Sequence, residues 1–141
     1  ILDGGLQAWL AAGHGVTQAS AQAPGGGIVN LSPGHMPTIE ADEAAALARD
    51  AVLLDSRGKA AYLGAPQEPG KPATGHIPGA FSAPATDALS SDGCFKPSEE
   101  LRVDFATLGA DGAKSIGVYC GSGNAAAATR LQNADDFMDE E

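Results

Sequence analysis

Two short apolar runs, each followed directly by polar or glycine residues, are the clearest pattern in the chain. Residues 51–54 read Ala-Val-Leu-Leu and precede Asp55, while residues 116–120 read Ile-Gly-Val-Tyr-Cys and precede a Gly-Ser-Gly turn. Apolar runs of this length are typical of strands that a parallel sheet buries on both faces. We therefore expect two buried parallel strands here, and a third short strand near Phe81.

Helical spacing of apolar positions alternates with these strands. It predicts helices over 38–50, 59–63, 97–108 and 124–133, the first beginning at Thr38 or Glu40 with Asp42 as a candidate N-cap. The predicted inward faces are apolar: Ala44, Leu47 and Ala48 in the first helix, and Leu101, Phe105 and Leu108 in the third. Strands that alternate with helices indicate the α/β class with a parallel sheet.

The two ends of the chain differ in composition from its middle. Residues 1–15 predict the end of a strand, a Gly-Gly turn and a short helix that Gly13 closes. Residues 16–37 are rich in Ala, Gln, Ser, Gly and Pro, which predicts a linker. Residues 38–134 then form the main domain, and residues 135–141 form an acidic, solvated tail.

The net charge of the chain limits the kinds of partner that it can bind. The chain has 18 Asp and Glu residues against 8 Lys and Arg, a net charge of −10. Nucleic acid and anionic membrane would repel such a protein, so an anionic substrate must be held by local dipoles. The chain shows no signal peptide and no apolar run of about 18 residues, so we expect a cytoplasmic protein. The periplasm stays open, because the sequence starts at Ile1 rather than Met.

Cys120 is the candidate nucleophile. It ends an apolar strand, and Gly121-Ser122-Gly123 then leads into a helix that begins near Asn124. This order places the sulfur among the N–H groups of a helix start, where partial positive charge lowers the pKa of a thiol. The alternative is a buried, inert cysteine at a strand end. Ser122 has two interpretations as well, as a hydrogen-bond donor to substrate or as a helix N-cap.

Other polar residues suggest supporting roles. Asp55 and Arg57 follow a strand at the sheet edge where α/β proteins place their sites, and we expect an ion pair that fixes the loop. His76 is interpreted as a turn residue, and Cys94 as incidental. The two cysteines indicate no disulfide framework. No His, Cys and Asp cluster has metal-ligand spacing, so we expect neither metal nor cofactor.

These motifs together resemble the tandem-domain rhodanese-like sulfurtransferases. In the family's order, they are Leu54-Asp55-Ser56-Arg57, Tyr62-Leu63-Gly64, Gly75-His76-Ile77-Pro78-Gly79-Ala80, residues 92–101, and Tyr119-Cys120-Gly121-Ser122-Gly123. The resemblance implies a three-layer domain around a parallel sheet. It also implies that residues 1–15 end a preceding repeat, and that the domain's own last strand, which lies beside the Cys120 strand, would follow residue 141. A hypothesis follows, in which residues 1–15 occupy that strand's place.

The resemblance also implies an activity. Cys120 would take sulfur from a small anionic donor, thiosulfate or 3-mercaptopyruvate, and pass it from a persulfide to a thiol or cyanide. The Gly-Ser-Gly loop favours 3-mercaptopyruvate, and the missing remainder of a two-domain chain is a further expected partner. The substrate-binding positions would be Gly121, Ser122, Gly123, Asn124, Ala125 and Lys71, with Asp55, Arg57 and His76 in support.

Several positions depart from related families. Ala61 and Gly70 stand where the sulfurtransferases commonly carry basic residues that bind the donor, and Lys71 is the only nearby substitute. The alternative is therefore a catalytically weak or inactive binding module with the same fold. A cysteine phosphatase is excluded, because its phosphate-clamping Arg is replaced by Ala126 and Arg130 comes too late.

Overall fold

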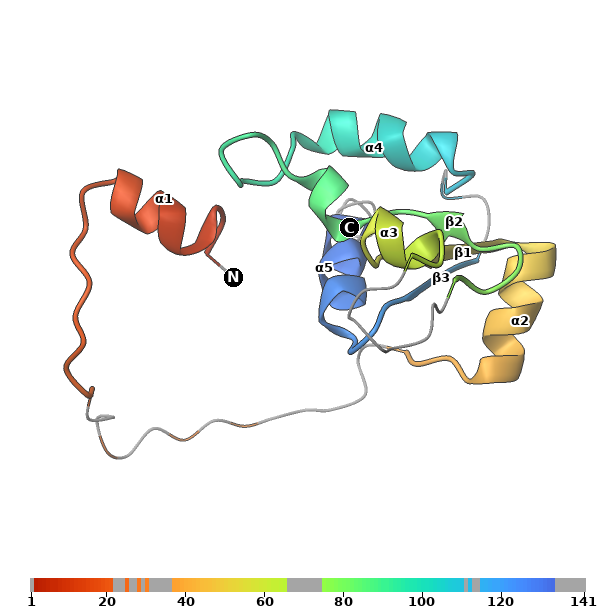
Figure 1. Ribbon diagram of the computed structural model, residues 1–141, viewed down its shortest axis with the longest axis horizontal. Coiled ribbons are helices and arrows are strands. Elements are labelled where there is room, and N and C mark those ends of the chain that lie inside the picture. The colour runs from red at the N-terminus through yellow and green to blue at the C-terminus, as the bar shows by residue number, and fades with distance from the viewer. Residues whose placement is uncertain are drawn as a thin grey trace.

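A parallel sheet with strand order β2-β1-β3 forms the centre of the molecule (Figure 1). The computed structural model describes residues 2–21, 25, 28, 30, 37–65, 75–110, 112 and 115–133. Strand β1 (Val52–Asp55) pairs in parallel with β2 (Phe81–Ser82) on one side and with β3 (Ile116–Tyr119) on the other. The predicted parallel α/β sheet is confirmed.

The two predicted apolar strands differ in burial. Every residue of β1 is buried, as its central position in the sheet requires. In β3 only Gly117 is buried, and Ile116, Val118 and Tyr119 are half-buried. The prediction of complete burial is therefore wrong for β3. Strand β3 lies at one edge of the described sheet, where β1 is its single neighbouring strand.

Helices cover both faces of the sheet (Figure 1). Helix α2 (Ala41–Asp50) packs its predicted face on Leu53 and Ala80. On the opposite face, α4 (Ser98–Thr107) packs Leu101, Phe105 and the adjacent Leu108 on Val52 and Leu54. Helix α5 (Asn124–Asn133) and the 3-10 helix η1 (Ala85–Ala88) contact each other on this side. The three-layer prediction is confirmed.

The start of α2 corrects one expectation. Asp42 lies within the first turn, and Glu40 is the N-cap. The Glu40 side chain accepts a hydrogen bond from the backbone of Glu43, and the Glu40 N–H donates to Oε2 of Glu43 at 2.8 Å. This reciprocal pair forms a capping box, which satisfies two N–H groups where a single Asp42 cap satisfies one. The short helix α3 (Lys59–Tyr62) follows β1 as predicted.

The chain start forms a helix but no strand. Helix α1 (Gly5–Ala11) is present as predicted, whereas Leu2 is not part of any strand. Gly4 and Gly5 have φ of 72° and 56°, a left-handed turn that leads directly into α1. Asp3 Oδ1 accepts a hydrogen bond from the Phe95 N–H at 2.9 Å, so this segment contacts the loop before α4. The hypothesis that residues 1–15 fill a strand position beside β3 is wrong for residues 2–15.

Two other predicted segments are described only in part. The described residues of the 16–37 linker are all exposed, and the predicted acidic tail, 135–141, lies outside the described residues. Within the ranges that the structure describes, none of the helices has the length and apolar character that a bilayer-spanning segment needs.

Candidate active site

Cys120 lies at the carboxyl end of β3, and the chain turns there into α5. The turn depends on Gly123, whose φ of 90° is in the left-handed region that favours glycine. In this conformation the Gly123 N–H donates a hydrogen bond to Sγ of Cys120 at 3.0 Å. The Gly123 carbonyl accepts from the Ala127 N–H at 2.9 Å, which continues directly into α5. The loop therefore curls around the sulfur.

The surroundings of Cys120 lower the pKa of its thiol. Partial burial acts in the opposite direction and raises the pKa, because it removes water from the thiolate. The backbone N–H groups of Ala126, Ser122, Gly123 and Ala125 stabilise the thiolate, and together they outweigh burial. These donors belong to the loop and to the first turn of α5, where the helix dipole also favours negative charge. The site therefore favours the nucleophilic form of the cysteine.

The loop residues that the sequence predicts to bind substrate differ in exposure. Gly121, Ser122, Gly123 and Asn124 are exposed, and Ala125 is half-buried. Helix α5 begins at Asn124, directly after Gly123. Ser122 is exposed and lies two residues after the cysteine. Lys71, the remaining residue predicted to bind substrate, lies outside the described residues.

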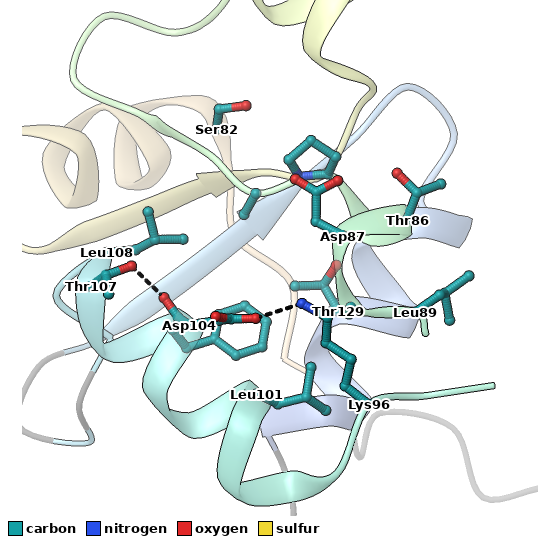
Figure 2. Close-up of a pocket in the computed structure, with 14 residues that line it drawn as sticks. Ser82, Thr86, Asp87, Leu89, Lys96, Leu101, Asp104, Thr107, Leu108 and Thr129 are labelled. Carbon is teal, nitrogen blue, oxygen red and sulfur yellow. Dashed lines mark hydrogen bonds and ion pairs between the residues drawn. The ribbon is translucent and has the colours of Figure 1, made fainter. Parts of the chain in front are cut away.

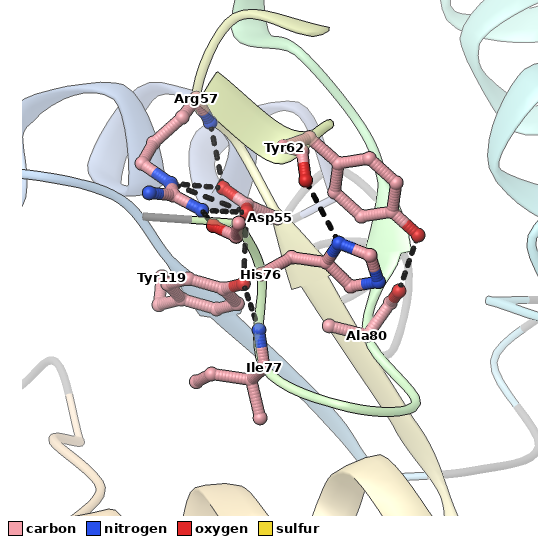
Figure 3. Close-up of polar contacts among 8 residues, drawn as sticks. Asp55, Arg57, Tyr62, His76, Ile77, Ala80 and Tyr119 are labelled. Carbon is pink, nitrogen blue, oxygen red and sulfur yellow. Dashed lines mark hydrogen bonds and ion pairs between the residues drawn. The ribbon is translucent and has the colours of Figure 1, made fainter. Parts of the chain in front are cut away.

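Asp55 and Arg57 form an ion pair at the carboxyl end of β1 (Figure 3). The Asp55 side chain is 0% exposed and lies 2.6 Å from Nη2 of Arg57, whose Nε also donates to it at 2.9 Å. Tyr119 adds a hydrogen bond from its hydroxyl to Asp55 Oδ2 at 2.8 Å. Burial raises the pKa of Asp55, but these hydrogen bonds more than reverse the effect and leave the pKa lowered. The geometry matches the ion pair that we expected.

The same network holds the 75–80 loop. The Tyr119 hydroxyl accepts a hydrogen bond from the Ile77 N–H at 3.1 Å, and Arg57 donates to the Gly75 carbonyl. His76 stacks on Tyr62 with ring centroids 3.7 Å apart and an interplanar angle of 10°. Nδ1 of His76 lies 2.8 Å from the Tyr62 carbonyl and must donate to it, because a carbonyl only accepts (Figure 3). These contacts fit the turn role expected of His76.

An open pocket of about 430 Å³ brings four of the predicted residues together, Cys120, Gly121, Arg57 and His76. The rest of its lining comes from Tyr119, Gly75, Ile77 and Pro78. Asp55 is not part of this lining and reaches the site only through Arg57 and Tyr119. Within the described ranges, no group of three or more His, Cys, Asp or Glu side chains is arranged to hold a metal ion.

A larger cavity, of about 590 Å³, lies between η1 and α4 (Figure 2). Lys96 and Asp104 form an ion pair of 2.9 Å there, above an apolar lining that includes Leu101 and Phe105. Cys120 does not line this cavity. Cavity size alone therefore does not identify the candidate active site. The smaller pocket is the candidate because the Cys120 thiol lines it.

Sequence analysis missed two buried hydroxyls next to the site. Ser56 is 3% exposed and Thr129 is 1% exposed, and their side-chain oxygens lie 2.9 Å apart. Ser56 belongs to a motif that we had quoted, and Thr129 is a polar residue on an otherwise alanine-rich helix face. A threonine among alanines was therefore the one feature of the sequence that could have indicated a buried hydroxyl at position 129.

Comparisons with known proteins agree with the fold. Residues 40–138 match the Rhodanese-like domain family. SseB from Mycobacterium tuberculosis is 36% identical over 131 residues, which covers 90% of this chain and 45% of SseB. The 3-mercaptopyruvate sulfurtransferase of Homo sapiens is 34% identical over 125 residues, which covers 87% of this chain and 42% of the human protein.

A solved structure gives the same result. SseA from Escherichia coli, described as a 3-mercaptopyruvate sulfotransferase with the rhodanese fold, has a TM-score of 0.73 and 28% identity to this chain. The match covers 96% of this chain and 50% of SseA. The chain thus spans half or less of the length of these relatives.

Proposed function

The chain belongs to the rhodanese-like domain family, and from this premise we propose that it is a sulfurtransferase in which Cys120 carries the transferred sulfur. The donor is a small anion, thiosulfate or 3-mercaptopyruvate, and the acceptor is a thiol or cyanide. The observation that carries the proposal is the set of loop N–H groups that lower the pKa of Cys120.

The first half-reaction loads the cysteine. The Cys120 thiolate attacks the outer sulfur of the donor and forms the S–S bond of a persulfide. With thiosulfate, the donor's S–S bond breaks and sulfite leaves with the electron pair. With 3-mercaptopyruvate, the C–S bond breaks, and the departing pyruvate enolate takes up the thiol proton.

The second half-reaction transfers the outer sulfur from Cys120 to the acceptor. A thiolate or cyanide attacks the outer sulfur of the persulfide, and the electron pair of the broken S–S bond returns to Cys120. The products are a new persulfide or thiocyanate. The loop N–H groups stabilise negative charge on Cys120 before loading and after release, and they do so without rearranging.

The pocket supports an anionic substrate. Cys120 shares the pocket lining with Gly121 and Arg57, and both backbone dipoles and a cation favour an anion there. We assign substrate binding to Gly121, Ser122, Gly123, Asn124, Ala125 and Lys71, with Asp55, Arg57 and His76 in support.

Mass spectrometry of Cys120 tests the proposal. After incubation with thiosulfate or with 3-mercaptopyruvate, we expect the Cys120 peptide to gain one sulfur atom, which cyanide then removes as thiocyanate. Cys120→Ser should lose this gain completely, whereas Cys94→Ser should keep it. A chain that gains no sulfur from either donor at millimolar concentration would overturn the proposal.

One observation favours the second candidate, a binding module with little activity. Arg57 is the only Arg or Lys among the described residues that line the pocket, and it is already paired with Asp55. Ala61 adds no charge on α3. The same experiment separates the two candidates, since a binding module would leave Cys120 unloaded.

A further inference from the structure

Ser56 contacts the chain on both sides of the Cys120 loop. Its N–H donates to the Tyr119 carbonyl at 2.9 Å, immediately before Cys120. Its hydroxyl lies 2.9 Å from Oγ1 of Thr129, in the helix after the loop. One residue at the end of β1 thus joins the strand that enters the loop to the helix that leaves it.

Thr129 extends this connection to the N–H groups around the sulfur. Its hydroxyl donates to the Ala125 carbonyl at 3.1 Å. A hydroxyl has one hydrogen, so with Thr129 donating to Ala125, Ser56 is the donor to Thr129. The hydrogen bonds therefore run from Ser56 through Thr129 to Ala125, whose own N–H helps to lower the pKa of Cys120.

The burial of the two hydroxyls makes this connection costly to break. Ser56 is 3% exposed and Thr129 is 1% exposed, so losing the Thr129 hydroxyl leaves the Ser56 hydroxyl with a buried, unmet hydrogen bond. Losing the Ser56 hydroxyl removes the hydrogen bond that Thr129 accepts, while Thr129 still donates to Ala125. An apolar pair of similar size would have filled the same space without that cost. A polar pair fixes direction and distance more narrowly than apolar packing does.

We infer that Ser56 and Thr129 are positioning residues, which hold the first turn of α5 against β1 so that its N–H groups stay directed at the Cys120 sulfur. This inference rests on the proposed role of Cys120 as the nucleophile. Both hydroxyls act through the α5 backbone, and neither is among the groups that lower the Cys120 pKa directly.

Alkylation of Cys120 by iodoacetamide between pH 5 and pH 10 tests the inference, with peptide mass mapping to separate Cys120 from Cys94. Thr129→Val keeps the shape of the side chain and removes the hydroxyl. We expect it to raise the pH midpoint of Cys120 alkylation and to slow the reaction at pH 7 about threefold to tenfold. Thr129→Ser keeps a hydroxyl and should stay within about twofold of the unaltered chain.

Two further variants separate positioning from general loss of stability. Ser56→Ala should move the midpoint in the same direction as Thr129→Val, and it provides the test if Thr129→Val does not fold. Leu47→Ala removes packing on the opposite face of the sheet, so it should lower the melting temperature without moving the midpoint.

The outcomes distinguish this inference from the proposed function. If the unaltered chain forms a Cys120 persulfide but Thr129→Val and Ser56→Ala leave the midpoint unchanged, the positioning role is wrong and the proposed function stands. A midpoint shift in Leu47→Ala equal to that in Thr129→Val would also overturn it. If the unaltered chain forms no persulfide, the proposed function itself fails.

Discussion

Cys120 and Cys94 are both half-buried and neither is in a disulfide, yet their surroundings move the thiol pKa in opposite directions. Burial raises the pKa at both positions. At Cys120 the N–H groups of the loop reverse that effect. At Cys94 the carboxylates of Asp3 and Asp92 add to it, because a thiolate there would face negative charge.

The comparison shows that partial burial alone does not decide the direction in which the pKa of a thiol moves. The two loops have similar turn chemistry, since Gly93 and Gly123 both have left-handed φ values, 83° and 90°. They differ in what the turn presents to the sulfur. A helix begins four residues after each cysteine, α4 at Ser98 and α5 at Asn124. At Cys120 the N–H groups of the turn and the helix start stabilise the thiolate, whereas the groups that act on the Cys94 thiol are the carboxylates of Asp3 and Asp92.

The largest expected effect is a difference in reactivity within one molecule. At pH 7 we expect iodoacetamide to alkylate Cys120 about tenfold faster than Cys94, because a larger fraction of Cys120 is thiolate. Part of this advantage is offset, since a thiolate of lower pKa is a weaker nucleophile. Peptide mapping at several pH values measures both rates in the same sample.

The pH dependence of alkylation follows from the pKa shifts of the two cysteines. Cys120 alkylation should reach its plateau at a lower pH than Cys94 alkylation. The lowered pKa also stabilises the folded chain at pH values above the unfolded thiol pKa, and this contribution disappears as the pH falls through the folded value. Equal midpoints for the two cysteines would contradict the electrostatic account of the site.

A smaller effect is expected from the turn itself. Gly123→Ala adds a Cβ that meets no atom within 4 Å, so its cost comes from the left-handed backbone, about 1–2 kcal/mol. If the loop relieves that strain by turning its N–H groups away from the sulfur, Cys120 alkylation at pH 7 should slow about fivefold to tenfold.

Gly93→Ala is the matched control, because its added Cβ also meets nothing within 4 Å and its φ is similarly left-handed. It should leave the Cys120 rate unchanged. If Gly123→Ala and Gly93→Ala both leave the rate of Cys120 alkylation unchanged, the geometry of the Cys120 loop does not control that rate.

The reactive loop was predictable because its determinants are consecutive in the sequence. A strand, a cysteine, a glycine turn and a helix start supply the N–H groups around the Cys120 sulfur without any residue distant in the sequence. Strand β1 was predictable for a similar reason, since its apolar residues are contiguous and central strands are buried on both faces. Local order along the chain was sufficient for both.

Features that depend on distant neighbours were not predictable. Ser56 and Thr129 are 73 positions apart, and no local pattern pairs them. The partial burial of β3 depends on which strands lie beside it, which its own residues do not specify. Glu40 was one of the two expected helix starts, but the N-cap was assigned to Asp42, because the reciprocal hydrogen bonds between Glu40 and Glu43 are visible only in the structure.

The smallest expected effect concerns the unreactive cysteine. Asp92 Oδ1 accepts a hydrogen bond from the Cys94 N–H at 3.0 Å, and Asp92→Asn can keep that bond through its amide oxygen while it removes the charge. Because burial and Asp3 also raise the Cys94 pKa, Asp92→Asn removes only part of the shift, and we expect only about a twofold faster alkylation of Cys94 at pH 8. Asp50→Asn, an exposed substitution on α2, controls for the change in net charge. If both variants speed Cys94 equally, or if Asp92→Asn speeds Cys120 as well, the carboxylates beside Cys94 do not set its local pKa. The contrast between the two cysteines would then rest on the Cys120 loop alone.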